Sequence, residues 1–340
     1  MFIRTLSPED KPAWEALVKR CPESGFMQSW AWSEFKAAQG QSVLRLGIFD
    51  GEKLEGGALV YSVESGLSPL QLPHGPVLPW GEPLKAAQCL ELLKTRLAEA
   101  AGSAGAPLAR LEPLLEGALP VCLEKFPRAP LDLAPTPTLL TDISGSDDEL
   151  LAAMQPKGRY NVRLALRKGV EVGSSAGTEG LEDFYGLFEL TSARHGFNGE
   201  PLSFFAGLLE KLGPSGAAKL YFARYKGMTL AAAVAVFYGG KATYLYGASA
   251  PFLRSAMAPY ALHWKIMRDG RALGCRVYDF YGIAPEGQPQ HAYSRFTQFK
   301  LRFGGRRAVT CGARDLYFYP RLARLLVDTL SKREKGVCNV

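Results

Sequence analysis

The stretch AKLYFARYKGMTLAAAVAVFYGGKATYLYGAS, residues 218–249, decides the fold of this 340-residue chain. It contains three runs rich in apolar and aromatic residues, separated by the pairs Lys226-Gly227 and Gly239-Gly240. Short glycine-containing pairs between such runs are typical of turns between neighbouring antiparallel strands. The stretch therefore predicts three consecutive strands, over 218–225, 229–238 and 242–246.

The same order of elements occurs in both halves of the chain. After residue 249, a helix is expected over roughly 255–273 and a strand over 276–280. About 175 residues earlier, strands over 42–49 and 56–63 and an apolar run over 67–77 precede a helix over 83–101 and a strand over 108–111. Such self-similarity at a long period indicates two copies of one α/β unit.

A proline-rich segment separates the two copies. Residues 127–138 contain Pro127, Pro130, Pro135 and Pro137, which disfavour regular structure. The acidic cluster Asp147-Asp148-Glu149 follows and is typical of a helix start. We therefore place a domain boundary near residue 145.

The charge differs between the two halves of the sequence. The formal net charge is +7, but residues 1–150 carry 13 Lys+Arg against 20 Asp+Glu (net −7) and residues 151–340 carry 27 against 13 (net +14). A basic half of this kind indicates either an anionic partner or a solvated surface.

Composition excludes several classes of protein. The N-terminal residues lack a signal-peptide pattern, and the longest apolar run, 230–238, is about half of a membrane span. The six cysteines are far apart and form no C-x-x-C pair, so we expect a soluble cytoplasmic protein without a disulfide scaffold, a metal site or a cofactor.

Two segments contain candidate binding residues. Arg159, Arg163 and Arg167 are four residues apart, so on a helix they form one stripe that either binds phosphates or is a solvated face. Tyr244 and Tyr246 are expected to place both rings on one face of a strand. Either the two hydroxyls bind oxygen-rich groups or the rings only pack.

A third segment, residues 295–305, contains Lys300 between phenylalanines and close to Gly304-Gly305. Because burial of an unpaired ammonium is costly, we expect Lys300 at a cleft, where it stabilises an oxyanion. An acyl-CoA enzyme is the alternative, but residues 254–259 contain no glycine, and Pro259 lacks an N–H to bind a pyrophosphate.

Several short motifs together resemble a known family. In chain order they are Gln28-Ser29-Trp30 through Lys36; Gly75-Pro76-Val77; Arg159-Tyr160-Asn161-Val162-Arg163; Tyr244-Leu245-Tyr246-Gly247-Ala248-Ser249; Asp279-Phe280-Tyr281-Gly282; and Phe299-Lys300 with Phe303-Gly304-Gly305. Their order and spacing resemble the FemABX family, non-ribosomal aminoacyltransferases that move an amino acid from aminoacyl-tRNA to the stem of a peptidoglycan precursor. The chain lacks a charged heptad segment and is similar to the short FemX type without a coiled-coil arm.

The resemblance implies an α/β (α+β) fold of two tandem acyl-CoA N-acyltransferase (GNAT)-like domains with mixed, mostly antiparallel sheets and a cleft between them. The first domain, expected over 1–145 plus the returning C-terminal segment 315–340, would bind the precursor. The second, expected over 146–314, would bind the aminoacyl-tRNA and phosphates.

The resemblance also implies roles for individual residues. Lys36 and Arg194 would hold the diphosphate of the precursor, together with Tyr244 and Tyr246. Phe299 and Lys300 would contact the terminal adenosine and the reacting ester, and Glu112 matches an acid once proposed as a base. Two positions depart from the family pattern, namely His74 for the usual arginine and Glu112 for the usual aspartate.

The function so implied is an amide-forming, cytoplasmic acyltransferase of cell-wall biogenesis and cell shape that builds an interpeptide bridge. It would transfer an amino acid to the amine of the third stem residue of UDP-MurNAc-pentapeptide or lipid II. We expect a monomer without a stable protein partner and with peripheral membrane contact. The alternatives are an acyl-CoA-dependent small-molecule N-acyltransferase and a non-catalytic binder of RNA or anionic glycan.

Overall fold

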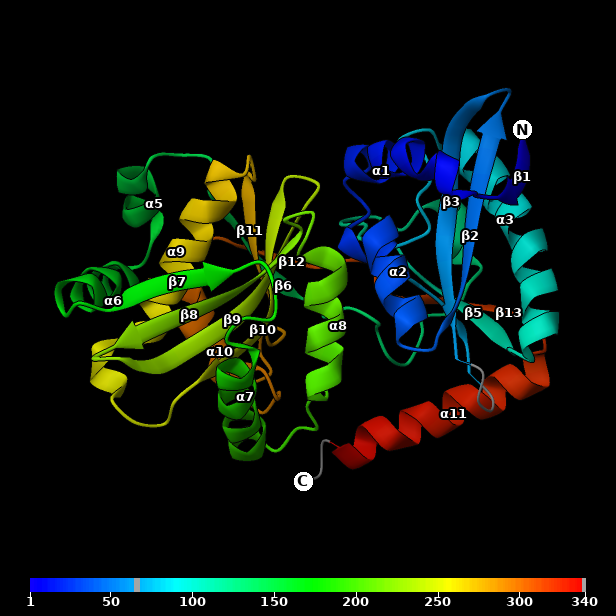
Figure 1. Cartoon of the computed structure of the whole chain (residues 1–340). Coiled ribbons are helices and arrows are strands. Elements are labelled where there is room, and N and C mark those ends of the chain that lie inside the picture. The colour runs from blue at the N-terminus through cyan, green and yellow to red at the C-terminus, as the bar shows by residue number, and fades with distance from the viewer. Residues whose placement is uncertain (64–67, 338–340) are drawn as a thin grey trace. The chain divides into compact units, whose positions relative to one another are not determined.

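The computed structural model of the chain describes residues 1–63 and 68–337, with side chains up to residue 331. Two compact units are present (Figure 1). One comprises residues 1–136 and 309–340, and the other comprises residues 137–308. Each unit contains one mixed β-sheet with helices on both faces.

The first unit is built on a six-stranded sheet in the order β1-β2-β3-β4-β5-β13. All neighbouring strands are antiparallel except β4 and β5, which are parallel. The strands are β1 (Phe2–Thr5), β2 (Ser42–Asp50), β3 (Lys53–Ser62), β4 (Leu70–Pro73), β5 (Leu108–Glu112) and β13 (Arg314–Tyr317). The apolar run expected over 67–77 thus forms β4, and its first residue, Leu67, lies outside the described residues.

Helices cover both faces of this first sheet. Helix α3 (Pro83–Ala104) packs its buried leucines against one face, and α1 (Lys11–Arg20) and α2 (Trp30–Ala38) lie on the other (Figure 1). Proline in the first turn and Gly105 at the C-terminus suit the two ends of α3. Further along, α4 (Val121–Glu124) is a single turn, and α11 (Pro320–Val337) ends the described chain.

The second unit repeats this plan with a seven-stranded sheet in the order β12-β6-β11-β10-β9-β8-β7. Here β10 and β11 form the parallel pair. The strands are β6 (Thr138–Asp142), β7 (Glu171–Ser175), β8 (Ala218–Tyr225), β9 (Met228–Tyr238), β10 (Lys241–Ser249), β11 (Val277–Gly282) and β12 (Arg306–Ala308). The strands expected at 218–225, 229–238 and 242–246 are confirmed within a few residues.

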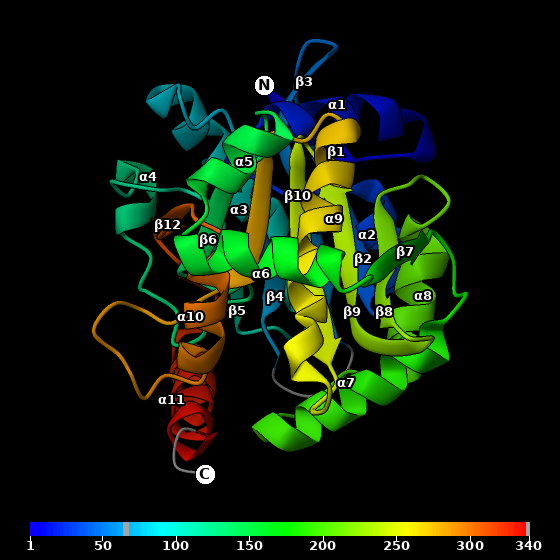
Figure 2. The same cartoon turned by 90° about the vertical axis from the view of Figure 1, so that its left-hand side faces the viewer.

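Helices of the second unit also divide between two faces. Helix α9 packs on one face of β8, β9 and β10, and α7 and α8 pack on the other (Figures 1 and 2). Adjacent residues of β8 show this division, since Tyr221 bonds to Asp269 of α9 and Phe222 contacts Gly180 at the start of α7. The helices are α5 (Asp147–Ala153), α6 (Pro156–Arg167), α7 (Leu181–His195), α8 (Leu202–Leu212), α9 (Ala258–Ala272) and α10 (Ser294–Leu301).

The first unit takes its last strand, β13, from the sequence beyond the second unit, and the second unit begins with β6, directly after the linker. Strand β6 follows the first unit in the chain but pairs with β11 and β12, and β13 follows the second unit but pairs with β5. The compact units therefore divide at 136/137 and 308/309, whereas the sequence placed the boundaries at 145 and 314. The difference arises because strand pairing, which the prolines do not reveal, assigns β6 to the second sheet.

A buried ion pair holds the returning strand in the first unit. Arg110 of β5 and Asp315 of β13 form two hydrogen bonds of 2.8 Å, with side chains only 3% and 1% exposed. Arg110 also donates to the carbonyl of Leu131 at 3.1 Å. This two-pronged geometry compensates the desolvation of both charges, which burial otherwise penalises.

The last helix docks differently from its sequence pattern. The leucines of residues 319–333 suggest one apolar face, but only Leu326 and Leu330 pack with Ala323 near Leu108. Leu322 and Leu325 are 43% and 56% exposed. Both leucines lie about 60° or more around the helix from the buried line, so the apolar stripe is wider than the contact beneath it.

The difference in charge is smaller between the two units than between the sequence halves. The first unit carries 19 Lys+Arg and 19 Asp+Glu (13 + 6 against 16 + 3), so its net charge is zero. The second unit carries 21 Lys+Arg and 14 Asp+Glu, so it holds the whole excess of +7.

Replacement of Asp315 tests the importance of the buried pair. Asp315→Ala leaves the Arg110 guanidinium buried without its counter-charge, and we expect a loss of about 3–5 kcal/mol in the free energy of unfolding. Urea denaturation of the full chain measures this loss. The control is Lys94→Ala, which breaks the exposed pair with Glu91 and should cost less than about 1 kcal/mol. Equal losses in the two variants would contradict the assignment.

Candidate functional site

An opening between two parallel strands forms the centre of the candidate site in the second unit. Strands β10 and β11 pair over only three residues each, ending at Thr243 and Asp279. Beyond that point β10 contains a bulge between Tyr244 and Tyr246, and β11 is irregular against β6 between Asp279 and Gly282. The carbonyl of Gly282, the last residue of β11, lies beyond the ladder with β10 and accepts a side-chain donor.

Lys300 fills one side of this opening. It extends from α10, is 9% exposed, and donates through Nζ to the carbonyl of Gly282 at 2.6 Å. Burial lowers the pKa of Lys300 to about 8, and the nearby Asp279 carboxylate opposes this effect. Within the described part of the chain, the ammonium has no hydrogen-bond acceptor besides Gly282, which leaves donors for a substrate oxygen.

One aromatic ring lies close to the Lys300 ammonium, and an aromatic cluster adjoins it. Its Nζ lies 5.7 Å from the ring centre of Tyr244, and Phe299, the preceding residue, packs against Tyr260, His263 and Phe303. Burial and the Lys300 charge lower the pKa of His263 to about 3, so its imidazole is neutral at pH 7. Nδ1 of His263 lies 2.8 Å from the Tyr278 hydroxyl. The site therefore presents one cation in an apolar, aromatic surround.

The two tyrosines of β10 lie on opposite faces of the sheet, contrary to the sequence expectation. Tyr244 contacts His263 of α9, whereas Tyr246 packs against Phe205 of α8 and Phe188 of α7. The bulge between them supplies the extra residue that reverses the alternation. Only Tyr244 therefore lies beside Lys300.

Gly247 leaves the space that the Tyr244 ring occupies. A Cβ built on Gly247 would lie 1.7 Å from the Tyr244 hydroxyl oxygen and 2.3 Å from the ring carbon that bears it. Any side chain at position 247 would therefore displace Tyr244. Burial raises the pKa of Tyr244 to about 12, so the hydroxyl remains protonated near neutral pH.

Arg194 lies in the last turn of α7, next to the C-terminal end of β10. Its guanidinium donates to the carbonyl of Ser249 at 3.2 Å and lies 3.2 Å from Nε2 of His195. Within the described residues it forms no ion pair, so its charge is available to an anion. Burial and the nearby arginines Arg194 and Arg295 lower the pKa of His195.

Lys36 lies in the last turn of α2 in the first unit. Its Nζ is 5.5 Å from the Trp32 ring centre and 5.7 Å from that of Phe35, which fixes the stem of the side chain against aromatic surface. Ser29 caps α2 by accepting the N–H of Trp32. These local contacts position Lys36 at the end of the helix.

Gln28 is a buried residue whose role the motif did not reveal. Its amide nitrogen donates to the carbonyls of Leu59 and Pro73, and its oxygen accepts the N–H of Leu59. A Cβ on Gly75 would lie 2.7 Å from the Gln28 side chain. Gln28 thus joins the start of α2 to β3 and β4, and the only sequence signal is a polar residue among aromatics.

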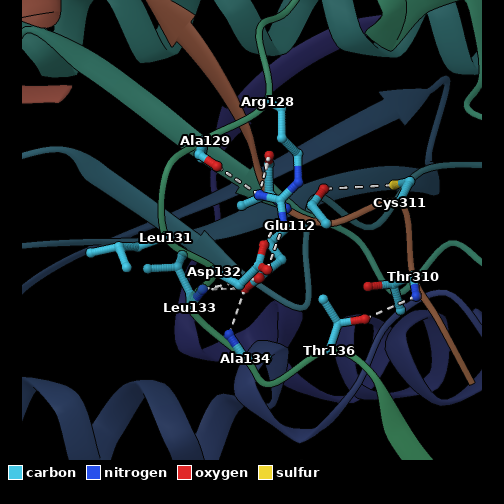
Figure 3. A network of polar contacts seen from close by, with 12 residues as sticks. Glu112, Arg128, Ala129, Leu131, Asp132, Leu133, Ala134, Thr136, Thr310 and Cys311 are labelled. Carbon is cyan, nitrogen blue, oxygen red and sulfur yellow. Dashed lines mark hydrogen bonds and ion pairs between the residues drawn. The ribbon is translucent and has the colours of Figure 1, made fainter. Parts of the chain in front are cut away.

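Glu112 at the end of β5 holds the linker between the units (Figure 3). Its carboxylate is 2% exposed and accepts the backbone N–H groups of Leu133 and Ala134 at 2.9–3.0 Å. Burial and the neighbouring Asp132 raise the pKa of Glu112 to about 8, although the amide hydrogen bonds act in the other direction. Asp132 in turn bonds to Arg128 and to the N–H of Ala313.

The structure therefore brings some of the expected site residues together and separates others. Lys300, Tyr244 and Phe299 form one cluster, whereas Tyr246 and Arg194 lie on the side of α7. Lys36 and Glu112 belong to the first unit. The described residues include no group of three or more His, Cys, Asp or Glu placed to hold a metal ion. No helix in the described part of the chain is long and apolar enough to cross a membrane.

Comparison with known proteins relates this geometry to characterised folds. Residues 156–300 match the acetyltransferase (GNAT) domain family. The crystal structure of FemX superimposes with a TM-score of 0.84 at 20% identity, over 96% of this chain and 100% of that one. A tandem GNAT protein from the clavulanic acid biosynthesis pathway superimposes with a TM-score of 0.54 at 12% identity, over 93% and 98% of the two chains. The fold and the site thus define a protein of two tandem GNAT-like domains.

Part of the chain is also similar in sequence to curated enzymes. A 92-residue stretch is 35% identical to lipid II:glycine glycyltransferase of Staphylococcus epidermidis and 36% identical to that of Staphylococcus aureus. The match covers 27% of this chain and 22% of each glycyltransferase. The chain is thus similar to these glycyltransferases over one limited stretch, and its likeness to FemX is one of fold.

The pH dependence of stability tests the environment of Glu112. Its pKa is raised from an ordinary 4.5 to about 8, so its contribution to stability is present at low pH and is lost as the pH rises through about 8. Glu112→Gln cannot ionise. We therefore expect the melting temperature of the variant, relative to wild type, to rise between pH 5 and 8.

Glu124→Gln, an exposed change on α4, serves as the matched control and should follow the wild-type profile throughout. Melting curves for Glu112→Gln that stay parallel to wild type from pH 5 to 8 would contradict the raised pKa.

Proposed function

We propose that the protein is an aminoacyltransferase that moves an amino acid from aminoacyl-tRNA to a peptidoglycan precursor. The acceptor is the amine of the third stem residue of UDP-MurNAc-pentapeptide or lipid II, and the product is an interpeptide bridge. The observation that carries the proposal is the nearly buried Lys300 ammonium in the opening between β10 and β11. The similarity to lipid II:glycine glycyltransferases supports the choice of acceptor.

The proposed reaction is the aminolysis of an ester. The neutral amine of the acceptor attacks the aminoacyl carbonyl carbon, and a tetrahedral intermediate with an oxyanion forms. When the intermediate collapses, the C–O bond to the ribose breaks, the hydroxyl leaves with a proton and the amide remains. The ester is already activated, so the main task of the protein is to align two large substrates.

Lys300 is suited to stabilise the oxyanion. A cation in a site with little water interacts more strongly with developing charge than it does in bulk water. The hydrogen bond to Gly282 fixes the position of Nζ before substrate binds, so little reorganisation is needed during the reaction. Tyr244 contributes a flat ring next to Nζ, and Phe299 adds another in the adjoining aromatic cluster; such rings suit the terminal base of an RNA.

The remaining candidate residues have binding or positioning roles in this proposal. Lys36 and Arg194 supply cations for the diphosphate of the precursor, and Tyr246 orders the β10 segment that ends at Ser249, the partner of Arg194. The raised pKa of Glu112 is suited to a general base. Its oxygens, however, already accept linker amides, so we assign it to holding residues 132–134 while the proton leaves through the substrate or water.

Removal of the ammonium tests the proposed chemistry. Lys300→Ala should slow transfer at least about tenfold, because one lost oxyanion donor typically costs that much or more. The assay uses purified protein, charged tRNA and precursor, and circular dichroism checks that the variant is folded. Wild-type turnover in the variant would remove Lys300 from the mechanism.

The pH profile of transfer gives an independent test. The ammonium of Lys300 is present below its pKa of about 8 and is lost as the pH rises through that value. The guanidinium of a Lys300→Arg variant remains charged throughout this range. We therefore expect the ratio of wild-type to variant rate to fall about tenfold between pH 7 and 9. The acceptor amine titrates equally in both assays, so a constant ratio would contradict a catalytic ammonium.

A further inference from the structure

Helix α6 presents an outer ridge formed by Tyr160, Arg163 and Arg167, called here the α6 ridge. The buried residues of this helix are Gly158, Asn161, Val162 and Ala165. At 100° per residue, Arg163 and Arg167 lie opposite the centre of that buried face, and Tyr160 lies one turn before Arg163. Figure 2 shows α6 crossing the outer side of α9.

The two arginines of the α6 ridge are exposed and have no anionic partner among the described residues. No acidic residue occurs between Lys157 and Val170, and neither Arg163 nor Arg167 forms an ion pair or a hydrogen bond with any described residue. Tyr160, one turn before Arg163, is 56% exposed. In contrast, Arg268 and Arg271 of the same unit both bind Asp147.

The neighbouring cations of α6 have structural partners and do not belong to the ridge. Arg159 donates to the carbonyls of Leu151 and Ala152 at the end of α5. Lys168 donates to the carbonyl of Ser255 at 2.7 Å. The stripe expected from the sequence therefore divides into one arginine that stabilises the fold and two that are available to a partner.

The start of α6 contacts the end of the helix that carries Lys300. The backbone N–H of Gln155 donates to the carbonyl of Arg302 at 3.1 Å, and a Cβ on Gly158 would lie 2.0 Å from the same oxygen. Arg302 directly follows α10 and is two residues from Lys300. The glycine is needed for this close approach, which joins the α6 ridge and the candidate site within one unit.

We propose that the α6 ridge binds the phosphate backbone of helical RNA whose 3′ end reaches Lys300. Arginine binds phosphate oxygens through two N–H groups, and four residues of helix separate the two arginines by about 6 Å. Tyr160 adds an aromatic hydroxyl suited to ribose and phosphate oxygens. Leu166 is the single exposed aliphatic side chain of α6, and one such residue beside two arginines favours RNA over insertion into a lipid surface. This inference rests on the proposed function for the identity of the RNA as the donor tRNA.

Binding of uncharged tRNA tests the ridge without any chemistry. Arg163→Gln together with Arg167→Gln should weaken binding about tenfold at low salt. The slope of log affinity against log salt should also fall by about 1 to 2, because two phosphate contacts are lost. Lys211→Gln with Lys226→Gln removes the same charge from exposed positions elsewhere in this unit and should change the affinity less than about twofold. Melting temperatures check that both double variants are folded.

An affinity of the arginine variant equal to wild type, or an equal loss in the lysine control, would overturn the proposal. A further arm measures binding to vesicles of phosphatidylglycerol and phosphatidylcholine. If the arginine changes abolish vesicle binding and leave tRNA binding intact, the ridge is a lipid surface instead.

The outcomes also distinguish a failure of the ridge proposal from a failure of the proposed function. If the arginine changes weaken tRNA binding but the protein transfers no amino acid, the result supports the ridge and contradicts the transferase. If the protein transfers an amino acid and the arginine changes do not affect the rate, the transferase is supported and the role of the ridge is contradicted.

Discussion

The buried pair of Arg110 and Asp315 is the interaction on which the two-unit architecture depends. It joins residues 205 positions apart and places the C-terminal strand β13 on the sheet of the first unit. The same strand β5 also carries Glu112, which binds the linker residues 133 and 134. Two ionisable side chains of one strand therefore hold both chain segments that pass between the units.

This arrangement explains why ionisable residues occupy the interior of the first sheet. An isolated buried charge is strongly unfavourable, but Arg110 has three acceptors and Glu112 has backbone donors. Apolar replacements would fill the space without specifying which segment pairs with β5. The fixed geometry of the guanidinium and carboxylate instead selects β13 and the linker.

The two copies of the α/β unit use their parallel strand pairs differently. In the first unit the pair β4 and β5 continues to Pro73 and Glu112, the N–H of Glu112 then donates to Gly75, and Gln28 packs against that glycine. In the second unit β10 and β11 separate after three paired residues, and Lys300 binds the released carbonyl of Gly282. The duplicated fold thus has a closed pair in one copy and an opening with a cation in the other.

The sequence by itself determined the repeated order of strands and helices, because glycine turns, apolar runs and helix-start residues act over a few neighbours. It also singled out Lys300, since a lysine among phenylalanines conflicts with an ordinary core. It did not reveal the bulge that separates Tyr244 from Tyr246, because one inserted residue leaves the apolar pattern nearly unchanged.

Only the tertiary structure decided which sheet takes β6 and β13, which carbonyl binds Lys300 and which arginine of α6 has a structural partner. Those outcomes depend on pairings between distant segments, and the contacts that select them form only when the chain is folded.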